Sequence, residues 1–557
     1  MRRPFSNAPA RPVSIRLFAA VFLALATLLP TGPAVKAATV QEAQRNLAII
    51  RINAIDLLAR EKRLPLPIQQ RRDVLRAYYE EQAGELLWLR DDRAEALVAI
   101  LNDAGADGLR PDDYPTRQLM SLMQNTDPED VRGLALIELF FSAAFLEYSG
   151  DLSVGRFLPA KVDPNFFLKT RTFDQAAALQ AVGKAEDLDA FFDAWQPPST
   201  YYASLRGALA QYRELAVEGG WDLVPLGPTL KPGMTDPRVA AIRERLSTTD
   251  GADPAPAGNA ELYDAELVKA VERFQARHGL DVDGVVGPAA MVAMNVPIED
   301  RIQEIELAME RWRWMPRDLG QQYLMVNIAG FELRRVKDGR AEERMSVVVG
   351  KPYSRTPVFS DQVRYLEFNP YWTVPAGIAV KEQLGKLRTN PGGLASQGFQ
   401  AVRGKDVYDL TAINWANYGP GNFPFQLRQQ PGPKNALGRV KFMFPNQHDV
   451  YLHDTPSQSG FSKAERAFSH GCIRLSRPLE LALQVLTAGG ISGWNMDRIN
   501  KVVATEKNTV VKLATPLPIH LTYLTAWVDE DGVNFRKDIY NQDAKLLAAL
   551  DGKALAW

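Results

Sequence analysis

The pattern of apolar residues changes once along this chain, near residue 320, from a helical to a strand-like period. Between about residues 40 and 221, apolar residues recur at helical spacing, as in DVLRAYY at 73–79 and LALIELFF at 134–141. After residue 322, β-rich runs alternate with Gly and Asp-Gly turns, as in YLMVNI at 323–328 and RMSVVV at 344–349. Further strands are expected at 363–368, 442–444, 450–453, 509–513 and 520–528. The second half should therefore form a mostly antiparallel β-sandwich or barrel with a few helices.

The length of 557 residues requires more than one hydrophobic core, because single cores stop growing beyond about 250–300 residues. We expect a multidomain α+β protein with a helical scaffold at 38–228, a small module at 229–300 and a β-rich domain at 301–557. Within the scaffold, Asp151 and Arg156 lie on a predicted turn and are candidates for a surface contact. The 65 basic and 66 acidic residues balance, which argues against nucleic acid or an anionic membrane surface as the main partner.

The first residues predict export from the cytoplasm. Arginines precede an apolar run from Leu17 to Leu29, and the small-residue stretch AVKAA follows at 34–38. The run is shorter than the ~20 residues that span a bilayer, so we expect cleavage near Ala37 rather than a permanent anchor. The mature protein, starting near residue 38, should therefore work in the periplasm or cell envelope.

The small module should contain three short helices. Two amphipathic stretches, at about 237–246 and 267–277, precede the connection GLDVDGVVGP at 279–288 and a last short helix. Asp281 and Asp283 do not form an EF-hand, because alignment on Gly284 leaves the first and twelfth ligand positions without an oxygen side chain. His278 ends the second helix, and no other His or Cys lies at metal-binding distance along the chain, so we interpret it as a structural residue.

A long insertion interrupts the β-rich domain at about 381–441. It is rich in Gly, Pro, Asn and basic residues and is expected to be irregular. Loops of this length inside a compact domain are usually functional or disordered. Because it precedes the predicted strand that ends at His453, we interpret it as a lid or substrate cradle, with a decorated surface loop as the alternative.

Cys472 is the only cysteine in the chain, so it cannot form an internal disulfide. It follows Ser469, His470 and Gly471 in a predicted turn, and His453 ends a predicted strand upstream. A thiol with a nearby imidazole meets the minimum for a nucleophile and its base. If His453 accepts or shares the thiol proton, Cys472 becomes a thiolate near neutral pH. Gly471 would allow a close approach of the backbone, and amide N–H groups of the turn could hold an oxyanion.

Two parts of the sequence resemble known families. The module, with VERFQARHGL at 271–280 and DGVVGP at 283–288, resembles the peptidoglycan-binding module of secreted wall enzymes. LHDTP at 452–456 followed by AFSHGCIRL at 467–475 resembles the catalytic motif of the L,D-transpeptidases, the YkuD-type domain. Similarity to the larger YcbB-type members, which carry a scaffold and a capping insertion, extends over the segments VVGKP at 348–352, FNPYWTVP at 368–375 and PGPKNALGRVKF at 431–442.

The resemblance implies roles for individual residues. Cys472 would be the nucleophile and His453 the proton acceptor and donor, with a backbone carbonyl near Asp454 orienting the His453 ring. His470 would lie in the same site, but it precedes Cys472 by two positions and need not point toward the sulfur. Ser469 would support the turn together with its neighbours.

Three further residues are candidates for substrate binding. Arg474 stands where the family often has Asn, and its guanidinium could hold a stem-peptide carboxylate, with an intradomain salt bridge as the alternative. Tyr371 and Trp372 could wall the cleft or belong to the core.

By resemblance, the chain is expected to be an exported peptidoglycan L,D-transpeptidase that releases a terminal D-alanine and cross-links third residues of stem peptides through a cysteine thioester. Water as acceptor would make it an L,D-carboxypeptidase, and a lipoprotein as acceptor would attach that protein to peptidoglycan. No cofactor or metal is expected. Stem peptides and glycan are the expected ligands, other cell-wall synthesis proteins are possible partners, and the sequence does not indicate an oligomeric state. Two other classes remain: a zinc peptidase using His453, His470 and Cys472, and a catalytically silent wall-binding scaffold.

Overall fold

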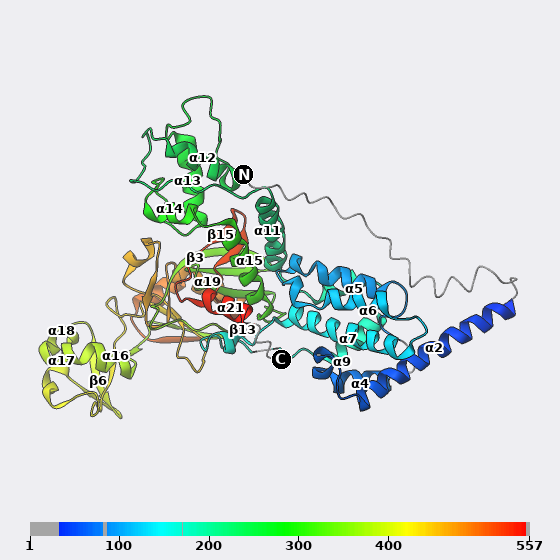
Figure 1. The fold of residues 1–557 in the computed structure, drawn as a ribbon. Coiled ribbons are helices and arrows are strands. Elements are labelled where there is room, and N and C mark those ends of the chain that lie inside the picture. Colours follow the sequence, from blue (N-terminus) through cyan, green and yellow to red (C-terminus); the bar gives the residue numbers. More distant parts are fainter. Residues whose placement is uncertain (1–32, 82–85, 170, 553–557) are drawn as a thin grey trace. The chain divides into compact units, whose positions relative to one another are not determined.

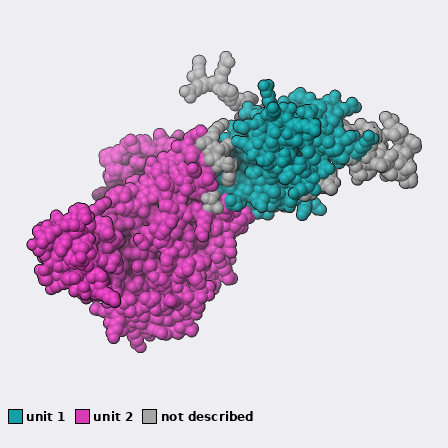
Figure 2. All heavy atoms as spheres, turned by 90° about the horizontal axis from the view of Figure 1, so that it is seen from below, with its two compact units in different colours: residues 1–156, 172–196 teal, residues 157–171, 197–557 magenta. Residues whose placement is uncertain are grey.

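The computed structural model describes residues 33–81, 86–169 and 171–552. They form two compact units, which Figure 2 shows in two colours. The first unit comprises the described residues up to 156 together with 172–196, and the second comprises 157–171 and the chain from 197 onward. No helix within the described ranges is long and apolar enough to cross a membrane. The predicted export signal at 1–37 lies outside the described residues, except for residues 33–37 at the start of α2.

The first unit is helical throughout its described part (Figure 1). Its longest buried helix, α7 (Val131–Val154), is apolar on almost all sides and packs against α2, α5, α6, α9 and α10, which explains its central position. The remaining bounds are α2 (Pro33–Arg60), α3 (Leu66–Gln70), α4 (Arg72–Glu81), α5 (Arg93–Asn102), η1 (Ala104–Asp107), η2 (Pro111–Asp113), α6 (Thr116–Asn125), α9 (Gln175–Lys184) and α10 (Leu188–Trp195).

A buried carboxylate ties α7 to the loop that follows α4. Glu138 accepts hydrogen bonds from the hydroxyl of Tyr79 at 2.8 Å and from backbone N–H groups of Leu87, Trp88 and Leu89. Burial raises the pKa of Glu138, whereas these donors favour its charged form. The network satisfies a side chain that would otherwise be costly to bury, so we interpret it as structural.

The interpretation of Asp151 and Arg156 as surface residues is wrong. Helix α7 continues through Gly150 to Val154, because the glycine packs under Phe173 and does not break the helix. Asp151 is buried and accepts from the hydroxyl of Tyr114, and Arg156 is buried and paired with an aspartate at the end of η2. Both side chains stabilise the interior of the helical unit.

The second unit begins with helices. The predicted three-helix module is present as α12 (Arg238–Asp250), α13 (Ala265–Arg277) and α14 (Pro288–Met294). The three helices share one hydrophobic core, to which α13 contributes Leu267 and Phe274. Arg277, at the end of α13, donates to the backbone oxygen of Val533 in β15 at 2.6 Å, so the module contacts the β-rich domain. The other bounds are α8 (Pro159–Val162), α11 (Thr200–Val217) and α15 (Ile298–Arg313), and α11 packs along α15.

The β-rich domain is built on a nine-stranded sheet in the order β11-β3-β12-β10-β9-β4-β13-β1-β2. Strand β2 also pairs with β3, so the pairing closes on itself, and only β1–β13, β10–β12 and β11–β3 are parallel. The expected mostly antiparallel barrel is therefore confirmed. The bounds are β1 (Gln322–Asn327), β2 (Glu332–Lys337), β3 (Arg340–Gly350), β4 (Phe359–Phe368), β9 (Val440–Met443), β10 (Leu452–His453), β11 (Ala467–Ser469), β12 (Ile473–Leu475) and β13 (Thr509–Thr522).

One difference from the predicted strands lies in β13, which runs unbroken from Thr509 to Thr522. The sequence suggests a break because Pro516 and Pro518 cannot donate to a ladder. Pro516 lies within a register shift in the pairing with β4, between Lys512 and Leu517, and Pro518 is paired in register with Gln362. A separate hairpin, β14 (Ala526–Asp529) with β15 (Gly532–Phe535), follows. Helices α19 (Pro478–Ala488), α20 (Met496–Ala504) and α21 (Gln542–Asp551) complete the domain's core.

The insertion is a small folded subdomain, so the expectation of an irregular loop is wrong. It contains the sheet β5-β8-β6-β7 and its own core around Trp415 and Leu427. Its first strand starts at Trp372, ahead of the predicted start near 381. We call residues 372–437 the cap. Its elements are β5 (Trp372–Thr373), α16 (Ala376–Ile378), the π-helical η3 (Ala379–Gln383), α17 (Leu384–Thr389), α18 (Pro391–Ala395), β6 (Phe399–Arg403), β7 (Asp406–Tyr408), η4 (Leu410–Ala412), η5 (Trp415–Asn417) and β8 (Gln426–Gln429).

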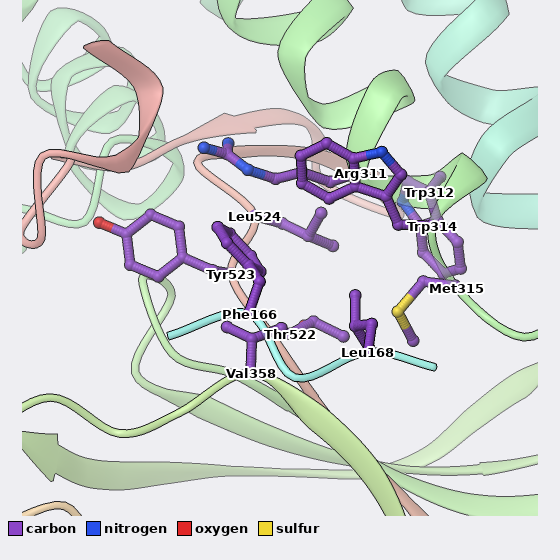
Figure 3. Close-up of a pocket in the computed structure, with 10 residues that line it drawn as sticks. All are labelled: Phe166, Leu168, Arg311, Trp312, Trp314, Met315, Val358, Thr522, Tyr523 and Leu524. Atoms are coloured by element: carbon purple, nitrogen blue, oxygen red, sulfur yellow. The ribbon is translucent and has the colours of Figure 1, made fainter. Parts of the chain in front are cut away.

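Residues 157–171, which follow α7 in sequence, belong to the same compact unit as the β-rich domain. The N–H of Phe167 donates to the oxygen of Val358 at 2.8 Å, and the ring of Phe166 lies 5.4 Å from that of Trp314. Figure 3 shows the side chains of Phe166, Trp314 and Val358 among those that line a small, mostly apolar cavity. The predicted boundaries at 228 and 300 stay predictions, and the division into compact units falls elsewhere.

Candidate active site

The turn before Cys472 is held by side-chain hydrogen bonds. The hydroxyl of Ser469 donates to the backbone oxygen of Cys472 at 2.6 Å and accepts from the N–H of Gly471 at 3.1 Å. Gly471 has a φ of +115°, which side-chain-bearing residues rarely adopt. The hydroxyl of Thr356 donates to the oxygen of Gly471 at 2.8 Å. Ser469 and Gly471 therefore fix the backbone on which the thiol stands.

Strand register brings Cys472 and His453 to one face of the sheet. In the parallel pair β10–β12, Leu452 lies opposite Ile473, and both side chains are fully buried in the core. Because side chains alternate along a strand, Tyr451, His453, Cys472 and Arg474 share the opposite face. The N–H of Ile473 donates to the oxygen of Tyr451 at 3.1 Å, which extends the pairing to Cys472.

His453 is buried and is oriented by its own neighbour. Its Nδ1 lies 2.5 Å from the backbone oxygen of Asp454. A carbonyl oxygen only accepts, so Nδ1 carries the proton and the lone pair is on Nε2. Burial, with a further contribution from the cation Arg474, lowers the pKa of His453 to about 3. The ring is therefore neutral at neutral pH and able to accept a proton.

The carboxylate of Asp454 has a different task from its backbone oxygen. It accepts from the N–H of Arg439 at 2.9 Å, from Nε of the same residue at 2.6 Å and from the N–H of Thr455 at 2.8 Å. These contacts fix the residue that holds the His453 ring. The predicted orienting carbonyl is thus present at Asp454.

Cys472 is half-buried. Its thiol donates a hydrogen bond to the backbone oxygen of Asp449, with 3.6 Å between the sulfur and the oxygen. Burial raises the pKa of this thiol, whereas hydrogen bonding by Tyr451 and the charges of Lys441 and Arg474 lower it. The net shift is upward. The expectation of a resting thiolate is therefore not met, and the proton must leave the sulfur during the attack.

Two residues near the thiol are missing from the sequence prediction. Tyr451 interacts with Cys472, which together with burial raises the pKa of its hydroxyl. The Nζ of Lys441 lies 3.9 Å from the centre of the Tyr451 ring, and burial lowers the pKa of this lysine. Lys441 pairs with His453 across β9 and β10. Alternation in Tyr451-Leu452-His453 gives a signal for Tyr451, whereas Lys441 depends on the register between strands.

His470 points to the cap. Its Nε2 lies 2.6 Å from a carboxylate oxygen of Glu382 in η3, and its side chain is about one-third exposed. This contact joins the catalytic turn to the cap. His470 is thus held toward the cap, whereas His453 shares the sheet face of Cys472.

Two of the three predicted substrate residues line a cavity of about 230 Å³ between the cap and the catalytic strands. Trp372 and Arg474 belong to its wall, whereas Tyr371 does not. Tyr371 is exposed, and the guanidinium carbon of Arg428 lies 4.8 Å from the centre of its ring. Arg474 forms no salt bridge with any described carboxylate, and its role in substrate binding stays a prediction.

Three family models match separate parts of the chain. The model of the L,D-transpeptidase catalytic domain matches residues 321–511, which include the turn, His453 and the cap. The chain contains an L,D-transpeptidase domain. A peptidoglycan-binding domain matches residues 235–294, and a scaffold domain matches residues 73–209. The predicted combination of scaffold, peptidoglycan-binding module and L,D-transpeptidase domain is confirmed.

Several L,D-transpeptidases are similar in sequence to part of this chain. A Haemophilus influenzae protein, whose name gives it as an inferred L,D-transpeptidase, is 31% identical over 224 residues, which are 40% of this chain and 45% of that protein. The chain thus matches less than half the length of this relative. A solved L,D-transpeptidase from Mycobacterium smegmatis is 15% identical, with 36% of this chain and 58% of that chain covered and a TM-score of 0.18. One from Xylanimonas cellulosilytica is 18% identical, with 53% and 98% covered and a TM-score of 0.17. Such TM-scores are too low to support a structural argument.

Proposed function

We propose that the protein is an exported peptidoglycan L,D-transpeptidase that uses Cys472 as its nucleophile and His453 as its base. The observation that carries this proposal is the placement of the only thiol of the chain on the same sheet face as a neutral, oriented imidazole, within an L,D-transpeptidase domain. The peptidoglycan-binding domain at 235–294 supports peptidoglycan as substrate. A substrate of the cell wall fits the predicted export signal.

In the first half-reaction, the sulfur of Cys472 attacks the carbonyl carbon of the third residue of a tetrapeptide stem while its proton passes to Nε2 of His453. The N–H of Cys472 has no hydrogen-bond partner among the described residues and is available to the developing oxyanion. The C–N bond to the terminal D-alanine then breaks, and His453 returns the proton to the departing nitrogen. A thioester and free D-alanine result.

In the second half-reaction, an amine of a neighbouring stem attacks the thioester and loses a proton to His453. The new C–N bond forms as the C–S bond breaks, and His453 returns the proton to the sulfur. The product is a cross-link between third residues, and the enzyme is regenerated. The chemistry balances with the two residues alone.

The test is incubation of the purified protein with disaccharide-tetrapeptides, followed by mass spectrometry of products and intact protein. Wild type should release D-alanine, form cross-linked dimers and carry a transient thioester on Cys472. Cys472→Ala should lose all three signals while retaining its circular dichroism spectrum and its binding to sacculi. Turnover by this variant at a wild-type rate would overturn the mechanism, and release of tripeptide without dimers would favour hydrolysis over cross-linking.

A further inference from the structure

The cavity under the cap has a wall of mixed origin. Residues of the cap, which include Lys434 and Ala436 near its end, contribute most of the wall. Thr455, Pro456 and Ser457, which follow His453 in sequence, and Arg474 contribute the rest. Aromatic and aliphatic side chains, among them Trp372, Leu394 and Phe399, form its apolar part. A volume of about 230 Å³ is large enough for the end of a peptide but not for a folded partner.

The charge of this cavity is of one sign. Lys386, Lys434 and Arg474 line it, and no Asp or Glu is among its lining residues. The nearest acids in sequence are engaged elsewhere, Glu382 with His470 and Asp454 with Arg439. The cavity is therefore complementary to an anion.

Two buried polar atoms in the wall have no partner in the described structure. The Nε of Arg474 is buried without an acceptor, and burial lowers the pKa of this guanidinium. The Oε1 of Gln383, whose side chain is 7% exposed, is buried without a donor. These two atoms have almost no accessible surface, so a ligand in the cavity cannot reach them. The terminal guanidinium nitrogens of Arg474 make no hydrogen bond to a described residue, and they are the groups of this side chain that a carboxylate in the cavity can meet. The end of a peptide chain supplies such a carboxylate.

The cavity lies on the His453 side of the thiol. Arg474 pairs in register with His453. It also follows Cys472 by two positions on the same face, so the Cα atoms of Cys472 and Arg474 lie about 7 Å apart. In the proposed function, His453 exchanges a proton with the nitrogen that leaves the acyl group and with the nitrogen that attacks it. Both nitrogens must then come from this side, and in a terminal amino acid a single carbon separates the nitrogen from the carboxylate.

We infer that the cavity under the cap is a binding site for the α-carboxylate of the amino acid whose nitrogen leaves or attacks the acyl group. Arg474 and Lys386 supply the positive charge that holds the carboxylate. This inference rests on the proposed function for its substrate, but it can be tested by binding alone. The same chemistry is offered by the departing D-alanine and by an acceptor that carries a free carboxylate.

The binding test uses the full chain with Cys472→Ala, titrated calorimetrically with a tetrapeptide stem and with its C-terminal amide. The free acid should bind about ten- to hundredfold more tightly than the amide, as expected for a charge-assisted contact. Adding Arg474→Gln should remove this difference by weakening only the acid. Equal binding of acid and amide, or equal weakening of both by Arg474→Gln, would overturn the inference. Arg403→Gln, on the exposed end of β6, is the matched control and should change neither affinity.

Two kinetic arms distinguish the sources of the carboxylate. Acylation of the wild-type protein by the acid and by the amide tests the departing residue, and cleavage of a preformed thioester by D-alanine and by D-alaninamide tests the acceptor. A preference for the acid in one arm alone assigns the cavity to that partner, and no preference in either arm overturns the inference. If the wild-type protein forms no thioester, the proposed function fails, while the calorimetric comparison still decides whether the cavity binds a carboxylate.

Discussion

The catalytic turn and the cap are neighbours joined through His470 and Glu382, but they are held in place by different forces. The turn has no core of its own and is fixed by hydrogen bonds from Ser469 and Thr356 to its backbone. The cap has its own small core around Trp415, separate from the core of the barrel. This difference suggests that the turn keeps one geometry while the cap can open as a unit without loss of the barrel.

The largest expected effect concerns the turn side of this comparison. His453→Ala removes the group that takes the thiol proton, so acylation should fall by about 10²–10⁴. His470→Ala should cost less than about tenfold, because the His470 ring contacts the cap rather than the thiol. Single-turnover acylation followed by intact mass measures both. A larger loss for His470→Ala than for His453→Ala would exchange the two roles.

The cap side is tested by Trp415→Ala. Trp415 is 3% exposed, and its indole N–H donates to the oxygen of Leu410 at 2.7 Å. Loss of this side chain should lower the free energy of local opening in the cap by about 3–5 kcal/mol. Hydrogen exchange should show faster exchange across residues 374–427 and unchanged exchange in β9 and β12. Val407→Ala, at an exposed position of β7, is the control. Equal acceleration in the barrel would mean that the two cores unfold together.

The sequence is informative where one short segment determines the geometry. The segment 469–472 contains the proposed nucleophile, the glycine needed for φ above zero and the serine that holds the turn, so these three assignments depend on local order alone. Lys441 and Thr356 reach the site only through strand pairing and a distant loop, and no local pattern indicates them. The sequence indicates where the cap lies in the chain, but it does not indicate that the cap folds into a sheet with its own core. The reason is that its strands are short and rich in polar residues.

Burial of His453 beside the turn also predicts a dependence of stability on pH. Its folded pKa of about 3 lies below the usual value of 6.5, so between these values the unfolded chain binds the extra proton. Stability should therefore fall as the pH drops from 6.5 toward 3, by up to about 1.4 kcal/mol per pH unit from this residue. Urea unfolding of wild type and His453→Asn between pH 4 and 7 should show a shallower slope for the variant. Parallel slopes would mean that the imidazole is not neutralised by folding.

The smallest expected effect concerns the contact between the two regions. His470 and Glu382 meet at 2.6 Å, but their side chains are 33% and 44% exposed, and ion pairs this accessible to water contribute less than about 1 kcal/mol. Glu382→Gln should therefore accelerate hydrogen exchange in α16 and η3 only slightly and lower acylation by less than about fivefold.

Salt separates this contact from a catalytic role of the same two residues. At a pH at which the imidazole carries a charge, screening at about 1 M salt should bring wild type close to Glu382→Gln in cap exchange. Asp406→Asn, on the exposed strand β7, should behave like wild type throughout. A loss of acylation for Glu382→Gln as large as that for His453→Ala would show that the pair takes part in proton transfer. The boundary between turn and cap would then belong to the catalytic machinery, and His470 would need a chemical role beyond its contact with the cap.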